Sequence, residues 1–174
     1  LLDGLQWTLT VALSAWLLAL LIGIAVGILR AQPKRVVSIL AGLWVDLFRN
    51  IPLLVQIFLW YFVIPELLPQ VMGDSIKKMQ NPWGSFVPAV LGLAFFTSAR
   101  VAEQVRAGIQ AIPRGQSMAA SALGLSTLQV YRYVLLPVAM RTILPPMTSE
   151  LMNTIKNSSV ALTIGLIEVT AAAR

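Results

Sequence analysis

The chain has 174 residues, of which 57% are hydrophobic and 11% are charged, whereas soluble domains contain about 45–50% apolar and about 25% charged residues. This composition leaves too little polar surface to cover a globule in water, so much of the chain should lie in lipid. The absence of cysteine and histidine excludes disulfide scaffolds, thiol nucleophiles, Ser-His-Asp triads and almost every zinc or haem site. The net charge is +6, but the basic residues do not cluster with aromatic residues, so we expect no nucleic-acid partner.

The first predicted element is a transmembrane helix over residues 4–29, a run of 26 residues without a charge. At 1.5 Å per residue this helix would be about 39 Å long, which exceeds a hydrocarbon core of about 30 Å and leaves room for tilt. Arg30 ends the run, and Pro33, Lys34 and Arg35 follow it. No cationic stretch precedes the apolar residues, so we expect a retained span rather than a cleaved signal peptide.

A second span is predicted over residues 36–65, with a kink or an interfacial start where Asn50-Ile51-Pro52 interrupts it. Residues 66–85 contain prolines, glycines and balanced charges, which predict a solvent-exposed loop. A third helix is predicted over residues 86–106. Two polar residues inside apolar runs are expected to make interhelical hydrogen bonds, namely Gln56 and Thr97.

Residues 107–137 contain several glycines and prolines and are too interrupted for a span, so we expect a long loop with short helices. A fourth hydrophobic helix is predicted over residues 138–155, followed by a shorter apolar stretch over residues 160–169. Basic residues concentrate on the connections between the first and second and the third and fourth spans, which should therefore face the cytoplasm. The sequence thus predicts an all-α membrane protein with about four spans and an outside N-terminus.

The long loop carries small residues that allow another backbone to approach closely. From Met118 to Pro137 its spacing resembles the cytoplasmic loop of the permease subunits of bacterial ATP-binding-cassette (ABC) importers. That loop reads Glu-Ala-Ala, three residues, Gly, nine residues, Ile, one residue, Leu-Pro, and Met118 stands where the family has Glu. The positions in register are Ala119, Ala120, Gly124, Val134, Leu136 and Pro137. The resemblance implies that these six residues couple the permease to its ATPase; the alternative is an interfacial loop stabilised by its own turns.

Further motifs extend the resemblance over nearly the whole chain. Residues 48–53, 102–109 and 156–160 look like the polar amino-acid branch of the family, and residues 58–69 with 163–166 look like glutamate/aspartate permeases. The family continues into a last span beyond the position of Arg174, so the sequence resembles a fragment that lacks that span.

The resemblance implies a type I importer transmembrane domain over residues 1–174, located in the bacterial inner membrane. Such a permease would move L-glutamate or L-aspartate from a periplasmic binding protein to the cytoplasm by alternating access. It would work in a complex with a second permease, identical or homologous, and two ABC ATPase subunits. No glycine-rich phosphate loop ending in Lys-Ser or Lys-Thr occurs, so the chain is expected to be no enzyme, and ATP hydrolysis is assigned to the ATPase. We assign no catalytic, cofactor or metal site. Glutamine, asparagine or basic amino acids are the alternative cargoes.

The fourth helix carries a polar stripe that should not face lipid. A lysine at the bilayer centre costs about 2.5–3.5 kcal/mol on insertion scales, so Lys156 should face water or a partner helix. A helix break at residues 157–159 would expose backbone groups that can bind a zwitterion. We therefore predict that the substrate path is lined by Asn153, Lys156, Asn157 and Ser158. The alternative is that Lys156 neutralises Glu150 or a carboxylate of a partner.

A charged cluster is predicted at the inner end of the third helix, where Arg100, Glu103 and Arg106 recur every three residues. This spacing suits mutual pairing that holds the end in register. The alternative is an inner gate in which Glu103 binds a loop arginine. If Lys156 and Glu103 instead bound protons or sodium ions, the chain would be an ion-coupled secondary transporter; a structural or sensory membrane subunit is a further alternative.

Overall fold

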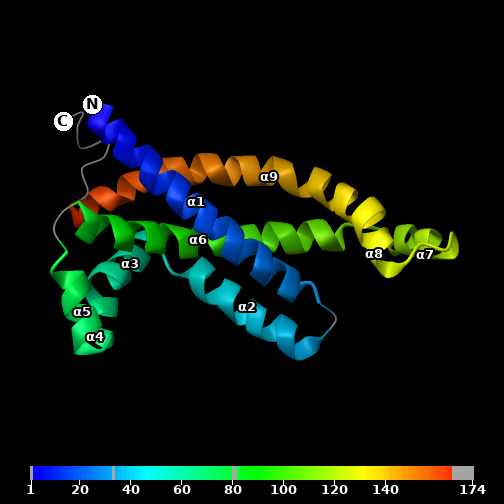
Figure 1. Cartoon of the computed structure of the whole chain (residues 1–174), viewed down its shortest axis with the longest axis horizontal. Helices are drawn as coiled ribbons and strands as arrows, with labels where there is room; N and C mark the ends of the chain where they lie inside the picture. Colours follow the sequence, from blue (N-terminus) through cyan, green and yellow to red (C-terminus); the bar gives the residue numbers. More distant parts are fainter. Residues whose placement is uncertain (1, 33, 80–81, 166–174) are drawn as a thin grey trace.

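The computed structural model describes residues 2–32, 34–79 and 82–165, and all regular structure in this part of the chain is helical. Three long helices form an elongated bundle (Figure 1), namely α1 (Leu2–Arg30), α6 (Trp83–Gln110) and α9 (Leu136–Asn157). A bent arm over residues 35–67 packs on α6 through residues 35–63, and a pair of short helices projects from one end.

The contacts between the long helices set their directions. Trp7 of α1 lies beside Trp83 at the start of α6, with ring centroids 6.0 Å apart, so these two helices run parallel. α9 runs antiparallel to both, because its first turns face the last turns of α6 and Thr154 near its end meets Thr97 at 3.5 Å. The Thr97 interhelical hydrogen bond expected from the sequence is therefore confirmed. We call the end of the bundle at which α1 and α6 finish the inner end.

Close backbone contact holds α1 against α6. One side of α1 consists of small residues at four-residue intervals, namely Ala15, Ala19, Gly23 and Gly27. A Cβ atom on Gly23 would lie 2.8 Å from the carbonyl oxygen of Ser98, and one on Gly27 would lie 2.7 Å from that of Ala102. Small residues at this spacing let transmembrane helices approach closely, so α1 and α6 form one rigid pair.

The second apolar segment breaks where the sequence predicted a kink, at residues 51–52, and the bend there is sharp. α2 (Arg35–Asn50) meets the helical run of α3 (Leu53–Phe58), η1 (Leu59–Val63) and α4 (Ile64–Leu67) at an angle of 100°. Pro52 lacks an N–H and disfavours helical geometry in the residue before it, which ends α2. Gln56 of α3 donates from Nε2 to the carbonyl oxygens of Phe48 in α2 (2.7 Å) and of Ile51 (3.0 Å). The interhelical hydrogen bond expected for Gln56 is therefore confirmed, and it stabilises the bend.

An aromatic cluster fixes both arms of the bend on α6. The ring of Phe95 lies 5.2 Å from Trp44, 5.0 Å from Phe48 and 4.8 Å from Trp60, measured between centroids. Trp44 and Phe48 come from α2 and Trp60 from η1, so one α6 side chain contacts both sides of the break. The sharp turn is therefore part of the packed fold.

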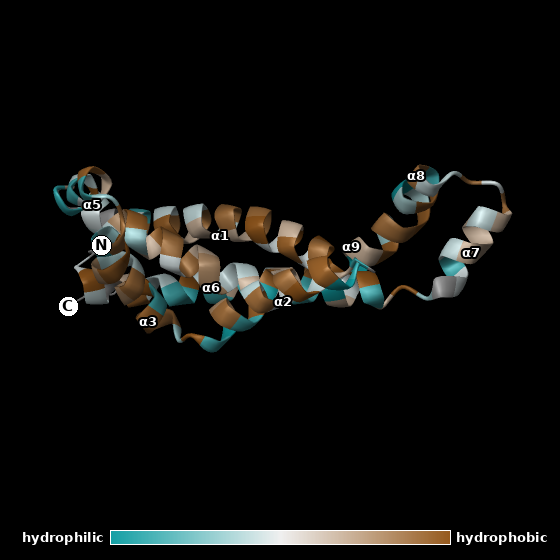
Figure 2. Cartoon of the chain, turned by 90° about the horizontal axis from the view of Figure 1, so that it is seen from below, coloured by the Kyte–Doolittle hydropathy of each residue, from teal (hydrophilic) through white to brown (hydrophobic). Residues whose placement is uncertain are grey.

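Hydropathy separates the bundle from its ends (Figure 2). Brown, apolar residues cover most of α1, whereas hydrophilic residues gather at α5 (Gln70–Lys77) and where α6 ends. By length and composition, two described helices can cross a bilayer, Gly4–Arg30 and Trp83–Gln110, and the bent pair would add a third. α9 does not meet the same criterion, because polar residues interrupt its apolar surface.

The segment predicted as a loop over residues 66–85 is partly helical, so that prediction is wrong over α5 (Gln70–Lys77). Pro69 starts this helix, and Gly73 packs against the carbonyl oxygen of Pro65 too closely for any side chain. Lys77 pairs with Glu66 at 2.6 Å across the turn, with both side chains exposed. The charges thus stay in solvent, as expected, while the backbone closes a small helical hairpin.

α9 ends at Asn157, and the 3₁₀ helix η3 (Ser158–Ile164) follows, which agrees with the predicted break. The hydroxyl of Ser85, at the start of α6, donates to the carbonyl oxygen of Ile164 at 2.7 Å and holds η3 at the end of the bundle where α1 and α6 begin. The predicted apolar stretch over residues 160–169 lies partly outside the described residues.

Candidate functional site

The predicted coupling loop forms a projecting elbow at the inner end, which we define as residues 111–137. It contains α7 (Arg114–Ala122), α8 (Thr127–Val130) and η2 (Tyr131–Leu135), and from Thr127 onward the helical backbone continues into α9. The elbow extends beyond the bundle (Figure 2), away from α1 and α6.

Gly124 makes the turn of the elbow through a defined helix stop. Its φ is +81°, in the left-handed region, and no atom lies within 4 Å of a Cβ built on it. Gly124 N–H donates to the carbonyl of Ser121 (3.0 Å), and Leu125 N–H donates to that of Ala120 (3.3 Å). These two bonds form a Schellman motif, in which glycine is favoured because other residues are strained at positive φ.

The other side of the elbow begins with a capping box that the sequence analysis did not identify. The Ser126 side chain accepts from the Gln129 N–H, and the Gln129 side chain accepts from the Ser126 N–H at 2.8 Å. The helix leading into α9 therefore starts at Ser126 rather than at Pro137. The Ser-x-x-Gln pattern is a known helix-start signature and was readable in the sequence.

The six predicted coupling residues are spread over three parts of the elbow. Ala119 and Ala120 lie on α7, Gly124 at the turn, Val134 in η2, and Leu136 with Pro137 at the start of α9. Of these, Ala120 is buried and Val134 half-buried, while the other four are exposed. The structure thus does not gather them into one contact; it distributes them along one projecting unit.

Large apolar side chains lie exposed on the elbow. Met118 is 70% exposed, Leu123 82% and Leu128 77%. These side chains are exposed although they are apolar, so they do not contribute to a core within the subunit. Met118 stands where the loop of the ABC importer permeases has Glu. Its side chain is apolar and exposed, so this position does not supply a charge.

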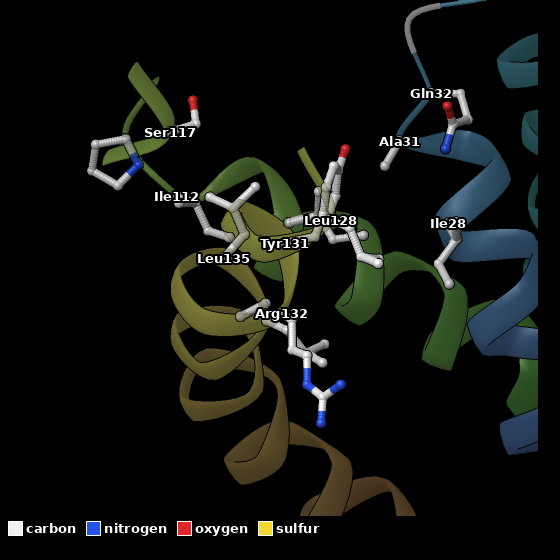
Figure 3. Close-up of a pocket in the computed structure, with 13 residues that line it drawn as sticks. Ile28, Ala31, Gln32, Ile112, Ser117, Leu128, Tyr131, Arg132 and Leu135 are labelled. Atoms are coloured by element: carbon white, nitrogen blue, oxygen red, sulfur yellow. The ribbon is translucent and has the colours of Figure 1, made fainter. Parts of the chain in front are cut away.

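A cavity of about 730 Å³ separates the elbow from the bundle (Figure 3). Leu128 and Tyr131 project into it from the elbow, opposite Ile28 and Ala31 at the end of α1. The lining is mostly apolar, with Arg132 at its edge. The part of the elbow that carries Leu128 and Tyr131 is therefore not packed tightly against the end of α1.

Glu103 is the centre of the charged cluster at the inner end. It accepts from Arg106 of the same helix at 3.0 Å and also pairs with Arg30, the last residue of α1. The Glu103 side chain is 20% exposed. Pairing between Glu103 and Arg106 matches the expected stripe. The second partner, Arg30, comes from the end of α1, and the sequence did not identify which arginine outside α6 would reach Glu103, since no local pattern connects residues 73 positions apart.

Arg100 does not join these pairs. Its guanidinium carbon lies 4.1 Å from the centre of the Phe96 ring, which is a cation–π contact within α6. The structure therefore brings Glu103 and Arg106 together and leaves Arg100 separate from them.

The predicted substrate-path residues lie near the middle of the bundle, because Thr154 meets Thr97 halfway along α6. Asn153 and Lys156 are exposed and Asn157 is half-buried. Ser158 is buried, and its hydroxyl donates to the carbonyl oxygen of Ile155 at 2.7 Å. Three of the four side chains thus lie at least partly on the surface of the subunit, whereas Ser158 stabilises the helix end.

Comparison with known proteins identifies the family of this chain. Residues 19–173 match the family model described as binding-protein-dependent transport system inner membrane component. The chain belongs to this family. It is an inner-membrane permease subunit of an amino-acid ABC importer, a transport component and not an enzyme.

Individual relatives support this assignment over nearly the whole chain. The glutamate/aspartate import permease protein GltJ of Escherichia coli K12 is 54% identical over 172 residues, which cover 98% of this chain and 70% of the relative. The nopaline transport system permease NocM of Agrobacterium fabrum is 36% identical, covering 100% of this chain and 71% of NocM. A crystal structure of an amino acid ABC transporter with histidines matches with a TM-score of 0.80 and 32% identity, over 99% of this chain and 75% of that one.

Proposed function

We propose that this permease carries L-glutamate and L-aspartate, which it receives from a periplasmic binding protein and releases into the cytoplasm. The observation that carries the proposal is the 54% identity to a glutamate/aspartate permease over 98% of the chain, compared with 36% to a nopaline permease. Transport then follows alternating access, in which the partners bias the equilibrium between two conformations of the spans.

The elbow is the proposed joint to the ATPase, with the coupling residues at 119, 120, 124, 134, 136 and 137. Its exposed apolar side chains and the Gly124 turn favour this role, since docking would cover Met118, Leu123 and Leu128. Two ATPase subunits and a second permease, identical or homologous, would complete the transporter. Because α8, η2 and α9 form continuous helical backbone, a displacement of the elbow would be transmitted directly to the α9 polar face.

That polar face is the proposed substrate path, with Asn153, Lys156 and Asn157 in contact with the solute. Lys156 is exposed near the end of α9, and no described carboxylate forms an ion pair with it. Exposure favours contact with a solute over neutralisation by Glu150.

The test uses the full-length permease reconstituted with its ATPase, second permease and binding protein in proteoliposomes. We expect uptake of labelled L-glutamate that requires hydrolysable ATP and is inhibited by excess L-aspartate but not by glutamine or arginine. Uptake that follows an ion gradient without ATP would refute the proposal in favour of a secondary transporter. Inhibition by glutamine or arginine would refute the proposed cargo alone.

A further inference from the structure

Arg100 is a half-buried charged residue of α6, one turn from Glu103 toward the start of the helix. Ionisable residues within membrane-spanning helices are costly, and they usually pair with one another or mark the path of a substrate.

The structure gives Arg100 no acidic partner. No described carboxylate lies within 4 Å of it. The nearest acidic residue along α6 is Glu103, one turn away, and that carboxylate already binds Arg30 and Arg106. The ring of Phe96 instead holds the guanidinium from one side, which leaves its fork of N–H donors free for another group.

Arg100 also lies on the side of α6 that its neighbours leave open. α1 packs on the side that carries Val101 and Val105, α2 on the side that carries Ala99, and α9 meets Thr97. The remaining stripe at helical spacing contains Phe96, Arg100, Glu103 and Ala107. Phe96 is buried, Arg100 and Glu103 are half-buried and Ala107 is exposed, so this stripe opens toward the inner end from Arg100 onward.

The open stripe lies next to the polar edge of α9. α9 turns Leu144, Met147 and Leu151 toward α1, which leaves Asn153 and Asn157 on the opposite edge, the side of Arg100. Because Thr97 and Thr154 face each other in antiparallel helices, Arg100 is level with the turn of α9 just before Asn153. A solute against Asn153 would therefore be within reach of the long arginine side chain.

We propose that Arg100 binds the side-chain carboxylate of the transported amino acid and so selects acidic over neutral cargo. This inference rests on the proposed function, because it names the group that would recognise glutamate and aspartate. A guanidinium matches a carboxylate with two parallel hydrogen bonds, and the Phe96 ring preorganises it. Arg30 and Arg106 keep Glu103 occupied, which prevents Glu103 from neutralising Arg100 in place of the substrate.

The test is equilibrium binding of labelled L-glutamate and of L-glutamine, its neutral isostere, to the purified full-length transporter complex. We expect Arg100→Gln to lower the preference for glutamate over glutamine at least tenfold, and Arg100→Lys to retain part of it. Arg141→Gln is the matched control, because it removes the same charge from an exposed position of α9 and should leave the preference unchanged.

Glu150→Gln separates substrate binding from a structural ion pair, since Glu150 is half-buried at the level of Arg100. If Arg100→Gln and Glu150→Gln weaken both ligands equally, Arg100 serves the fold and the inference is wrong. An unchanged preference in Arg100→Gln would overturn it as well. A wild-type complex that binds neither amino acid would refute the proposed function itself, and this inference with it.

Discussion

The close contact between α1 and α6 predicts that replacing a contact glycine by alanine destabilises the protein, although alanine normally stabilises a helix. A Cβ atom on Gly27 would lie 2.7 Å from both the carbonyl oxygen of Ala102 and the Cβ of Val105. These are backbone-fixed atoms, so the two helices would have to separate by several tenths of an ångström. Overpacking of this kind costs about 1–3 kcal/mol, whereas alanine gains about 1 kcal/mol over glycine in a helix interior. We expect Gly27→Ala to destabilise the permease by a net of about 0–2 kcal/mol.

Gly42→Ala is the matched control, because the nearest atom to its added Cβ is the Nε atom of Arg30 at 3.8 Å. This variant should gain the full helix-propensity term of about 1 kcal/mol. Thermal unfolding of the detergent-purified, assembled permease, followed by tryptophan fluorescence, should give a lower melting temperature for Gly27→Ala than for Gly42→Ala. If both variants raise the melting temperature equally, the close α1–α6 contact is wrong.

Three further substitutions test other parts of the account. Glu103→Gln removes the carboxylate from Arg30 and leaves Arg106 only its bond to Gln110, so the free energy of unfolding should fall by about 1–3 kcal/mol. Arg30→Gln combined with it should recover part of the loss, and equal melting temperatures would contradict the pairing. Gln56→Leu removes the donor of two backbone carbonyls at the bend, so the permease should be destabilised by about 1–3 kcal/mol and melt at a lower temperature. An unchanged melting temperature would show that the bend does not need Gln56. Lys156→Gln should leave the melting temperature unchanged, because Lys156 is exposed, but raise the KM of glutamate uptake several-fold; unchanged kinetics would remove Lys156 from the path.

The long helices could be predicted from the sequence because many residues contribute to each. The segments predicted over 4–29, 86–106 and 138–155 correspond to α1, α6 and α9 within four residues at every end. The break after Asn157 was also predictable, since a run of Asn and Ser residues is a local signal. At these positions the residues nearby in the sequence were sufficient to predict where the helices lie and end.

The remaining features depend on contacts between distant segments. The role of Gln56 at the bend requires the end of α2 and the start of α3 to be folded together, so the 100° angle does not follow from Pro52 alone. The pair between Arg30 and Glu103 similarly needs α1 and α6 to be parallel. α5 was mistaken for a loop because Gly73 reads as a helix breaker, whereas here it allows the close approach to Pro65.

The central claim is that the ATPase drives the spans through the elbow, and Gly124→Val tests it most directly. A valine at φ +81° would be strained by at least about 1–2 kcal/mol, which should reshape the turn without touching the bundle. Gly115→Val is the control, because it also adds a side chain where nothing lies within 4 Å, but at a position without positive φ. In proteoliposomes with ATPase and binding protein, we expect Gly124→Val to insert normally and to lose ATP-driven glutamate uptake at least tenfold, while Gly115→Val keeps it. Uptake at the wild-type rate in Gly124→Val would contradict the account.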